Sequence, residues 1–215
     1  MGRILDLWVN ASIRLSEENL ASRDGRVDAW IDNNSSFDKY VANGWQLPII
    51  EVDAKLLTRR PGKILNVGYG MGFMDKAIRR ANPEQHTIVE IHPEIAQNAR
   101  DAGFTDVYEG DWFDFVKQCK KNNVKYDAIY FDGYCFDNRP DWQLFTMNVN
   151  DLLEDDGLYC YFNGEDAYQQ EVKQYLLDHM WSISEQTSYK VVATGWLNNK
   201  KSTRSVNWKS ISWKK

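Results

Sequence analysis

Three glycines and one acid in the middle of the chain have the spacing of a nucleoside-binding site. Gly68, Gly70 and Gly72 follow an apolar run at residues 63–67, and Glu90 ends the next apolar run, 20 residues after Gly70. Glycine allows backbone angles that other residues avoid and lets a ligand approach the main chain closely. An acid at the end of the second strand of an open α/β sheet typically binds ribose hydroxyls. We therefore expect these residues to hold a nucleoside.

The spacing of the glycines separates two classes of nucleoside cofactor. A dinucleotide fingerprint needs Gly-x-Gly-x-x-Gly, but position 73 is Phe and the third glycine comes early, at Gly72. The segment also offers no obvious basic group for a pyrophosphate beyond the amino terminus of the following helix. S-adenosylmethionine carries a sulfonium and an amino-acid tail but no phosphate. The pattern predicts S-adenosylmethionine as the cofactor and S-adenosylhomocysteine as its product, and a nicotinamide dehydrogenase is the least favoured enzyme.

Further polar and aromatic residues follow other apolar runs directly. In Gly110-Asp111-Trp112, Asp111 offers an acceptor for an adenine amino group and Trp112 a ring to lie beside it. The alternative for Trp112 is a residue at a helix start that packs in the core, and the sequence leaves both open. Tyr134 and Asn163-Gly164 stand in similar positions and are candidates for binding the second substrate.

Asp132 is the strongest candidate for chemistry. It ends the apolar run at residues 128–131, where an unpaired carboxylate is costly to bury. A charged partner is therefore expected, and a cationic ligand would serve. The alternative is a capping acid in a loop between a strand and a helix.

These residues need a sheet that brings the ends of several strands together. Apolar runs alternate with segments of helical periodicity, which predicts a doubly wound α/β sheet, Rossmann-like and mostly parallel. Ligands bind such sheets at the carboxyl ends of the strands, near the point where the strand order reverses. The expected strands are 63–68, 87–91, 105–109, 126–132, 157–163, 189–196 and 205–213, and the expected helices are 72–81, 93–102, 112–122, 141–154 and 165–180.

The two ends of the chain differ from this alternating centre. Residues 1–60 carry apolar clusters separated by polar turn-formers, which predicts short helices and loops lying over another structure: an extension or flap, followed by a cofactor-binding domain at residues 61–215. The last two strands lack a full helix between them, so they are expected to pair as an antiparallel hairpin. The basic residues at 200–204 are interpreted as part of a solvated tail.

Composition limits the classes of partner. The formal net charge of −5 disfavours nucleic acid, which needs a basic face. No segment has the length and hydropathy of a membrane span or of a signal peptide. The three cysteines, Cys119, Cys135 and Cys160, lack the spacing of a metal or redox motif and fit reduced thiols. We expect a cytoplasmic protein with a small-molecule substrate, no metal, and no membrane or nucleic-acid partner.

The chain resembles one branch of the S-adenosylmethionine-dependent methyltransferases, that of guanidinoacetate N-methyltransferase and the fungal type IV arginine N-methyltransferases. Most methyltransferases have an acid where Asn66 stands, whereas Gly70-Met71-Gly72 and the Tyr-Phe-Asp ending at 130–132 are fairly specific to this branch. The match covers about residues 61–165. Its segments are Leu65-Asn66-Val67-Gly68-Tyr69-Gly70-Met71-Gly72, Val89-Glu90-Ile91-His92-Pro93, Glu109-Gly110-Asp111-Trp112, Tyr126-Asp127-Ala128-Ile129-Tyr130-Phe131-Asp132 and Tyr161-Phe162-Asn163-Gly164.

The resemblance implies a class I methyltransferase fold with an amino-terminal flap over the site. Glu90 would hold the ribose, Asp111-Trp112 the adenine, and Asp132 the guanidino group of the methyl acceptor. The family adds a glutamate from a Trp-Glu pair just before the first strand; here Glu51 or Asp53 is the candidate, and neither has a tryptophan beside it. The implied cofactor-binding residues are Gly68, Tyr69, Gly70, Met71, Gly72, Glu90, Ile91, Gly110, Asp111, Trp112 and Asp132.

Three hypotheses remain open. The first is an N-methyltransferase of a guanidino group, in a small metabolite or in arginine. The second keeps the methyl donor and changes the acceptor to another amine or a carboxylate metabolite. The third is a non-catalytic protein that binds the cofactor or a partner with the same fold. The sequence also leaves open whether residues 1–47 form a flap or a contact in a homodimer.

Overall fold

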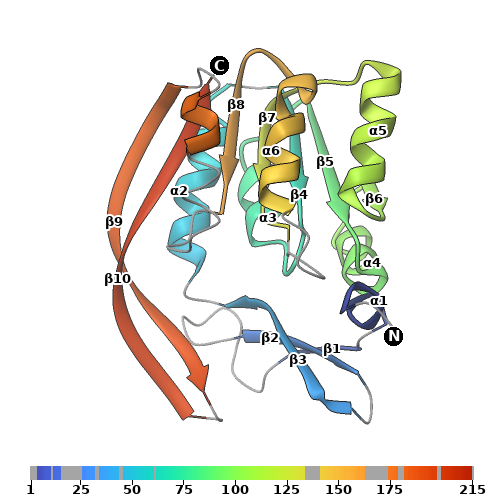
Figure 1. Ribbon diagram of the computed structural model, residues 1–215, viewed down its shortest axis with the longest axis vertical. Helices are drawn as coiled ribbons and strands as arrows, with labels where there is room; N and C mark the ends of the chain where they lie inside the picture. Colours follow the sequence, from blue (N-terminus) through green and yellow to red (C-terminus); the bar gives the residue numbers. More distant parts are fainter. Residues whose placement is uncertain are drawn as a thin grey trace.

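Seven strands form the central sheet of the computed structural model, which describes residues 4–10, 12–15, 26–31, 34–43, 46–60, 62–133, 141–162, 174–178, 182–197 and 200–214. The strands are β4 (Lys63–Val67), β5 (Gln85–Glu90), β6 (Val107–Glu109), β7 (Tyr126–Phe131), β8 (Leu153–Tyr161), β9 (Ser182–Leu197) and β10 (Lys200–Lys214). Their order in the sheet is β6-β5-β4-β7-β8-β10-β9 (Figure 1).

The first five strands are parallel, and their order reverses between β4 and β7. β4 pairs with β5 on one side and with β7 on the other, so the strand order turns back at this point. The β4 residues Ile64, Leu65 and Val67 are all buried, because helices cover both faces of the sheet. The doubly wound parallel sheet expected from the sequence is confirmed, with its switch point at the ends of β4 and β7.

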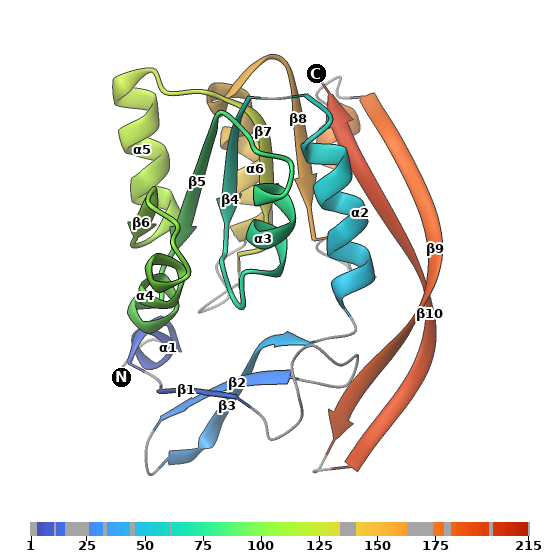
Figure 2. The same cartoon turned by 180° about the vertical axis from the view of Figure 1, so that it is seen from behind.

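The helices form two layers around the sheet (Figures 1 and 2). Side chains of α2 (Leu47–Leu57) and α3 (Phe73–Arg79) pack with Ile64, Ala128 and Tyr130 on one face. On this face α4 (Pro93–Asp101) packs on Ile88. On the other face, α5 (Trp112–Asn122) and α6 (Asp141–Leu152) pack with residues that include Phe131. The helix expected at 165–180 lies mostly outside the described residues, of which 174–178 are helical.

The last two strands form the expected antiparallel hairpin. β10 pairs with β9 along its whole length, and its final residues, Ser212–Lys214, pair antiparallel with β8. Both strands are longer than expected: β9 begins at Ser182 and β10 at Lys200, although the added residues at 182–188 and 200–204 are mostly polar and only a few of them favour strands. The interpretation of residues 200–204 as part of a tail is wrong, since they begin β10.

The amino-terminal segment contains a sheet that the sequence interpretation missed. α1 (Ile4–Val9) is helical, but β1 (Ser12–Leu15), β2 (Arg26–Ile31) and β3 (Asn34–Asn43) form a three-stranded antiparallel sheet. The expectation of short helices and loops is therefore wrong for these residues. Apolar residues alternate with polar ones in part of β2, which is the period of a strand. The small sheet lies across the end of the molecule toward which the parallel strands point (Figure 2).

Within the described residues, no helix combines the length and the apolar character needed to cross a membrane.

The aromatic packing between α6 and β7 gives a test of the core. Phe145 is fully buried and its ring stacks on Phe131 at 4.3 Å between centroids. Phe145→Ala is expected to lower the free energy of unfolding by about 3–5 kcal/mol, because the truncation leaves a cavity. Met147 lies on the same helix and is 54% exposed. Met147→Ala should change the free energy of unfolding by no more than about 0.5 kcal/mol in the same urea titration. Equal effects of the two substitutions would contradict this packing.

Candidate active site

A turn built on glycine joins the ends of β4, β5 and β7. The N–H of Gly68 donates to the carbonyl oxygen of Val89 at 2.8 Å, and the N–H of Asp132 donates to the carbonyl oxygen of Val67 at 2.9 Å. Gly68 has a φ of 97°, and a Cβ placed on it would lie 2.5 Å from the carbonyl oxygen of Asp132. Only glycine fits such a position. The switch point is therefore closed by direct backbone packing.

Glu90 binds the glycine turn from the end of β5. Its Oε2 accepts hydrogen bonds from the N–H groups of Tyr69 at 2.9 Å and Gly70 at 3.4 Å, and its Oε1 accepts one from the N–H of His92 at 2.8 Å. Burial raises the pKa of the Glu90 carboxyl, while the backbone donors oppose that rise. An ionised carboxylate has about four lone-pair sites. The backbone N–H groups of the turn and of the residues after β5 therefore use most of these sites, and they fix the Glu90 carboxylate at the end of β5.

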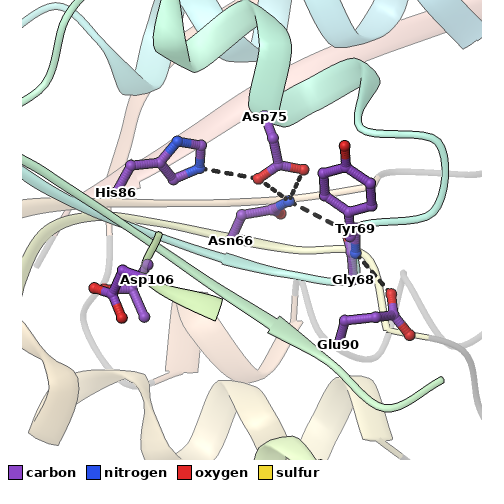
Figure 3. A network of polar contacts seen from close by, with 8 residues as sticks. Asn66, Gly68, Tyr69, Asp75, His86, Glu90 and Asp106 are labelled. Atoms are coloured by element: carbon purple, nitrogen blue, oxygen red, sulfur yellow. Dashed lines mark hydrogen bonds and ion pairs between the residues drawn. The ribbon is translucent and has the colours of Figure 1, made fainter. Parts of the chain in front are cut away.

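A buried polar network lies beside the turn and contacts it through Asn66 (Figure 3). The side-chain amide of Asn66 donates to both carboxylate oxygens of Asp75 at 2.9 Å and to the carbonyl oxygen of Gly68 at 3.1 Å. Nε2 of His86 lies 2.9 Å from Oδ1 of Asp75, a contact at ion-pair distance that does not have hydrogen-bond geometry. An acid at position 66 would repel Asp75, whereas the amide supplies donors. Asn66 thus links β4 to the first turn of α3.

Asp132 lies directly after β7, beside the glycine turn. The residue is partly exposed, but the protein around its carboxyl excludes much of the water. This desolvation, together with the negative charge of Glu90, raises the pKa of Asp132 to about 7 from an ordinary value of 3.8. A cation placed at these two carboxyls would favour their ionised forms.

The two acids of α2 lie in different environments. The side chain of Glu51 is 46% exposed, and Nη2 of Arg80 donates to both of its carboxylate oxygens, at 2.5 and 2.7 Å. Arg80 follows the carboxyl end of α3, whereas the glycine turn precedes its amino end, so this pairing holds Glu51 at the end of α3 farthest along the chain from the turn. Asp53 is buried, at 2% exposure, and accepts a hydrogen bond from the Tyr130 hydroxyl at 3.3 Å. Of the two candidates, Asp53 is the one that contacts a side chain of β7.

Trp112 stands at the start of α5 and packs in the core, as one of the two interpretations of this residue expected. Its ring is buried edge-on against Phe131 and Phe145, and its indole N–H donates to Oδ1 of Asp141 at 3.1 Å. The carboxylate of Asp111 caps α5 by accepting from the N–H of Phe113 at 2.9 Å. A role of either residue beside an adenine stays a prediction.

The remaining sequence candidates are only partly placed. Tyr69 is buried in the turn, Met71 is half-buried, and Ile91 packs beside the cluster that contains Tyr69. Gly110 donates its N–H to the carbonyl oxygen of Glu90 at 2.9 Å and so lies next to the end of β5. Three substrate-binding candidates lie outside the described residues: Tyr134, Asn163 and Gly164.

The charges of the described site suit S-adenosylmethionine better than a pyrophosphate. The glycines of the turn carry no side chains, which leaves their backbone accessible to a ligand. The two carboxyls beside the turn, those of Glu90 and Asp132, both have raised pKa values. Anionic phosphates would add repulsion to these acids, whereas a sulfonium would relieve it. Among the described residues, no cluster of His, Cys, Asp or Glu has the arrangement of a metal site.

Comparison with known proteins agrees with this chemistry. The model of one protein family, guanidinoacetate N-methyltransferase, matches residues 25–212, which is most of the chain. The chain belongs to the guanidinoacetate N-methyltransferase family. The resemblance stated from the glycine turn and the Tyr-Phe-Asp ending is thereby confirmed.

Curated relatives of this family member include fungal arginine methyltransferases. The chain is 32% identical over 152 residues to protein arginine N-methyltransferase 2 of Aspergillus oryzae, covering 64% of this chain and 37% of the relative. It is 27% identical over 169 residues to the protein of the same name from Candida glabrata, covering 74% of this chain and 38% of the relative. The chain therefore spans little more than a third of the length of these relatives.

Solved structures share the fold. Ribosomal protein L11 methylase from Lactobacillus delbrueckii subsp. bulgaricus superposes with a TM-score of 0.57 at 14% identity, covering 80% of this chain and 79% of that one. The O-methyltransferase TomG from Streptomyces achromogenes, in complex with S-adenosylmethionine, gives 0.51 at 17% identity, covering 77% and 78%. The Rossmann-like methyltransferase fold is thus confirmed.

Two features of this guanidinoacetate N-methyltransferase family member were missed by sequence reasoning. Trp8 of α1 is buried, and its ring lies edge-on to that of His92 at 5.4 Å between centroids. The apolar residues next to Trp8 in the sequence could have indicated that it is buried. The second feature is Trp45-Gln46, directly before α2. In this pair an amide, and not an acid, stands beside a tryptophan ahead of α2.

Glycine substitutions test the closure of the switch point. Gly68→Ala should destabilise the protein and weaken S-adenosylhomocysteine binding at least tenfold, because the new methyl group meets the Asp132 carbonyl. Gly103→Ala is the control: its φ is 83°, but nothing lies within 4 Å of an added Cβ. It should cost only the left-handed strain of about 1–2 kcal/mol and leave binding unchanged. Urea unfolding and isothermal titration measure both effects, and unchanged binding in Gly68→Ala would refute the model of the turn.

Proposed function

We propose that this chain is an S-adenosylmethionine-dependent N-methyltransferase of a guanidino group, in a small metabolite or in arginine. The observation that carries the proposal is Asp132, a desolvated carboxyl beside Glu90 at the carboxyl end of β7, with a pKa of about 7. Such a carboxyl favours a cationic ligand and can accept a proton near neutral pH. Membership of the guanidinoacetate N-methyltransferase family supports the acceptor class.

The reaction follows from the charges of the two substrates. A guanidinium is planar and cationic, and its nitrogens are poor nucleophiles until one proton leaves. Asp132 binds the guanidinium by hydrogen bonds and takes this proton as the nitrogen attacks the methyl carbon. The carbon–sulfur bond breaks, and its electron pair stays on sulfur as the neutral thioether of S-adenosylhomocysteine. Most of the acceleration comes from holding nitrogen, carbon and sulfur in line.

The roles of the other residues follow from their positions. The glycine turn and Glu90 hold the nucleoside, with Tyr69, Met71 and Ile91 beside them. Asp132 contacts the acceptor, and Asp53 supplies the second negative charge from behind Tyr130, since Asp53 is buried. Glu51 is the weaker candidate because Arg80 holds it.

A non-catalytic binding protein is the second candidate. Glu51 is paired with Arg80 and Asp53 is buried, so among the described residues neither candidate presents an exposed, unpaired carboxylate to the acceptor. A protein of this kind would bind S-adenosylhomocysteine but release no methylated product from any guanidine or amine. A methyl-release assay across arginine, guanidinoacetate and other amines separates the two candidates and also tests the acceptor class.

We infer further that the protein works in the cytoplasm on a small acceptor. The buried free thiols of Cys119 and Cys160 support a reducing compartment. The net charge of −5 supports a cationic acceptor rather than nucleic acid. For the amino-terminal segment we favour a flap over a contact in a homodimer, because β1–β3 lies across the end toward which the parallel strands point (Figure 2).

Ligand binding tests the cofactor. S-adenosylhomocysteine is expected to bind in isothermal titration with a Kd of micromolar order, and NAD is expected to give no binding heat, because its pyrophosphate meets Glu90 and Asp132. Glu90→Gln should weaken S-adenosylhomocysteine binding about tenfold or more, since the amide keeps the shape but loses the charge that strengthens hydrogen bonds. Glu109→Gln, an exposed acid paired with Arg100, is the matched control. Binding of NAD in place of S-adenosylhomocysteine would refute the assignment.

The pH dependence tests Asp132. The ionised form binds the guanidinium, so kcat/KM should rise with pH through about 7, the pKa of the free enzyme, and level off above it. The rise of kcat with pH should occur at lower pH than the rise of kcat/KM, because the bound cations lower the pKa of Asp132. Asp132→Asn should abolish turnover, whereas Asp114→Asn, an exposed acid on α5, should retain it. Full activity in Asp132→Asn would remove the mechanism.

Stability gives an independent check on the same carboxyl. The pKa of Asp132 is raised on folding, so the native state binds the proton more tightly than the unfolded state between about pH 4 and 7. The free energy of unfolding of the unmodified protein should therefore fall, relative to that of Asp132→Asn, as pH rises through this window. A constant difference between the two proteins would contradict the raised pKa.

A further inference from the structure

A buried phenol and a buried carboxylate lie between α2 and the sheet. Tyr130 on β7 is 1% exposed and Asp53 on α2 is 2% exposed. The Tyr130 hydroxyl donates to Oδ2 of Asp53 at 3.3 Å. The residues packed around the phenol are mainly apolar and include Ile64, Ala128 and Cys160. This is a polar pair within an otherwise hydrophobic layer.

The geometry of β7 places this pair next to the acceptor site. Ala128 and Tyr130 pack on the face covered by α2, whereas Phe131 packs on the opposite face. Successive residues of a strand alternate between faces, and the Asp132 N–H still pairs with β4, so Asp132 falls on the same face as Tyr130. The charges of Asp53 and Asp132 both act on the phenol and, after burial, raise the pKa of Tyr130.

Packing alone does not explain this pair. Phenylalanine would fill nearly the same volume as Tyr130, and an apolar residue at position 53 would avoid the cost of burying a carboxylate. The hydroxyl has a specific electrostatic effect, because a donated hydrogen bond favours the charged form of a buried carboxyl. The bond from Tyr130 therefore offsets part of the cost of burying the Asp53 carboxylate and fixes its orientation.

We propose that Tyr130 is a positioning residue of the acceptor site: it fixes Asp53 as a second negative charge behind Asp132, and this charge selects a cationic acceptor over a neutral one of the same shape. The inference rests on the proposed function, because it concerns the acceptor of that reaction. Tyr130 acts through Asp53 and does not itself exchange the proton. Asp132 contacts the guanidinium, and Asp53 adds to the field at a distance.

The test compares acceptors that differ only in charge. Guanidinoacetate and ureidoacetate form one pair of isosteres, and arginine and citrulline form another. Their dissociation constants are measured by titration into protein saturated with S-adenosylhomocysteine. The unmodified protein should prefer the guanidino member, and Tyr130→Phe should reduce that preference about tenfold, as expected for the loss of one nearby charge in a partly desolvated site. Binding of S-adenosylhomocysteine itself should change less than twofold.

Matched variants separate positioning from simple packing. Tyr108→Phe also removes a phenol oxygen, one that accepts a hydrogen bond from Gln118 at 3.1 Å, and it should keep the full preference. Asp53→Asn should lose the preference to the same extent as Tyr130→Phe. The double variant should lose no more than either single variant, because both remove the same charge. A loss of preference in Tyr108→Phe, or additive losses in the double variant, would overturn the inference.

Two outcomes distinguish this inference from the proposed function. If the unmodified protein shows no preference for the guanidino compounds, the proposed acceptor is wrong and the inference fails with it. If the unmodified protein shows the preference and Tyr130→Phe keeps it, only the inference fails. Should Tyr130→Phe not fold, as judged by circular dichroism, Asp53→Asn decides alone: lost preference supports the positioning role and retained preference refutes it.

Discussion

The close packing of Gly68 against the carbonyl of Asp132 at the switch point sets the geometry of the whole site. It fixes the spacing of β4 and β7 where their order reverses, so it also fixes where Asp132 lies relative to the glycine turn. Glu90 then ties the turn to β5 through the N–H groups of Tyr69 and Gly70. Three strand ends are thus held together by main-chain contacts, and the functional side chains take their positions from them.

A concentration of negative charge distinguishes this site from a simple nucleoside cleft. Glu90 and Asp132 interact unfavourably, and a further carboxyl, that of the buried Asp53, packs under α2 against Tyr130. Such an arrangement is costly for the isolated protein and becomes favourable when cations enter. A sulfonium donor and a guanidinium acceptor together supply two positive charges. The same desolvation that raises the pKa of Asp132 makes it a suitable proton acceptor near neutral pH.

The central part of the fold was predictable because its strands are buried on both faces. Continuous apolar runs such as the one ending at Phe131 identify β7 and its neighbours, and the residues that follow them are the candidates for the site. The β1–β3 sheet was not recognised, because polar turn-formers within residues 1–60 were taken as signals of loops. The environments of Glu51 and Asp53 could not be predicted from the sequence either. They lie two positions apart on one helix, and only tertiary packing pairs one with Arg80 and buries the other.

The position of Trp8 connects the amino-terminal helix α1 to the residues around Glu90. Its ring lies against His92, whose N–H is bonded to Glu90, the acid proposed to hold the ribose. Docking of α1 and occupation of Glu90 therefore act on a shared group and form coupled equilibria. By reciprocity, whatever free energy the docked helix adds to cofactor binding, the cofactor adds to docking of the helix. The ring contact between Trp8 and His92 would then connect the packing of α1 to ligand binding at Glu90.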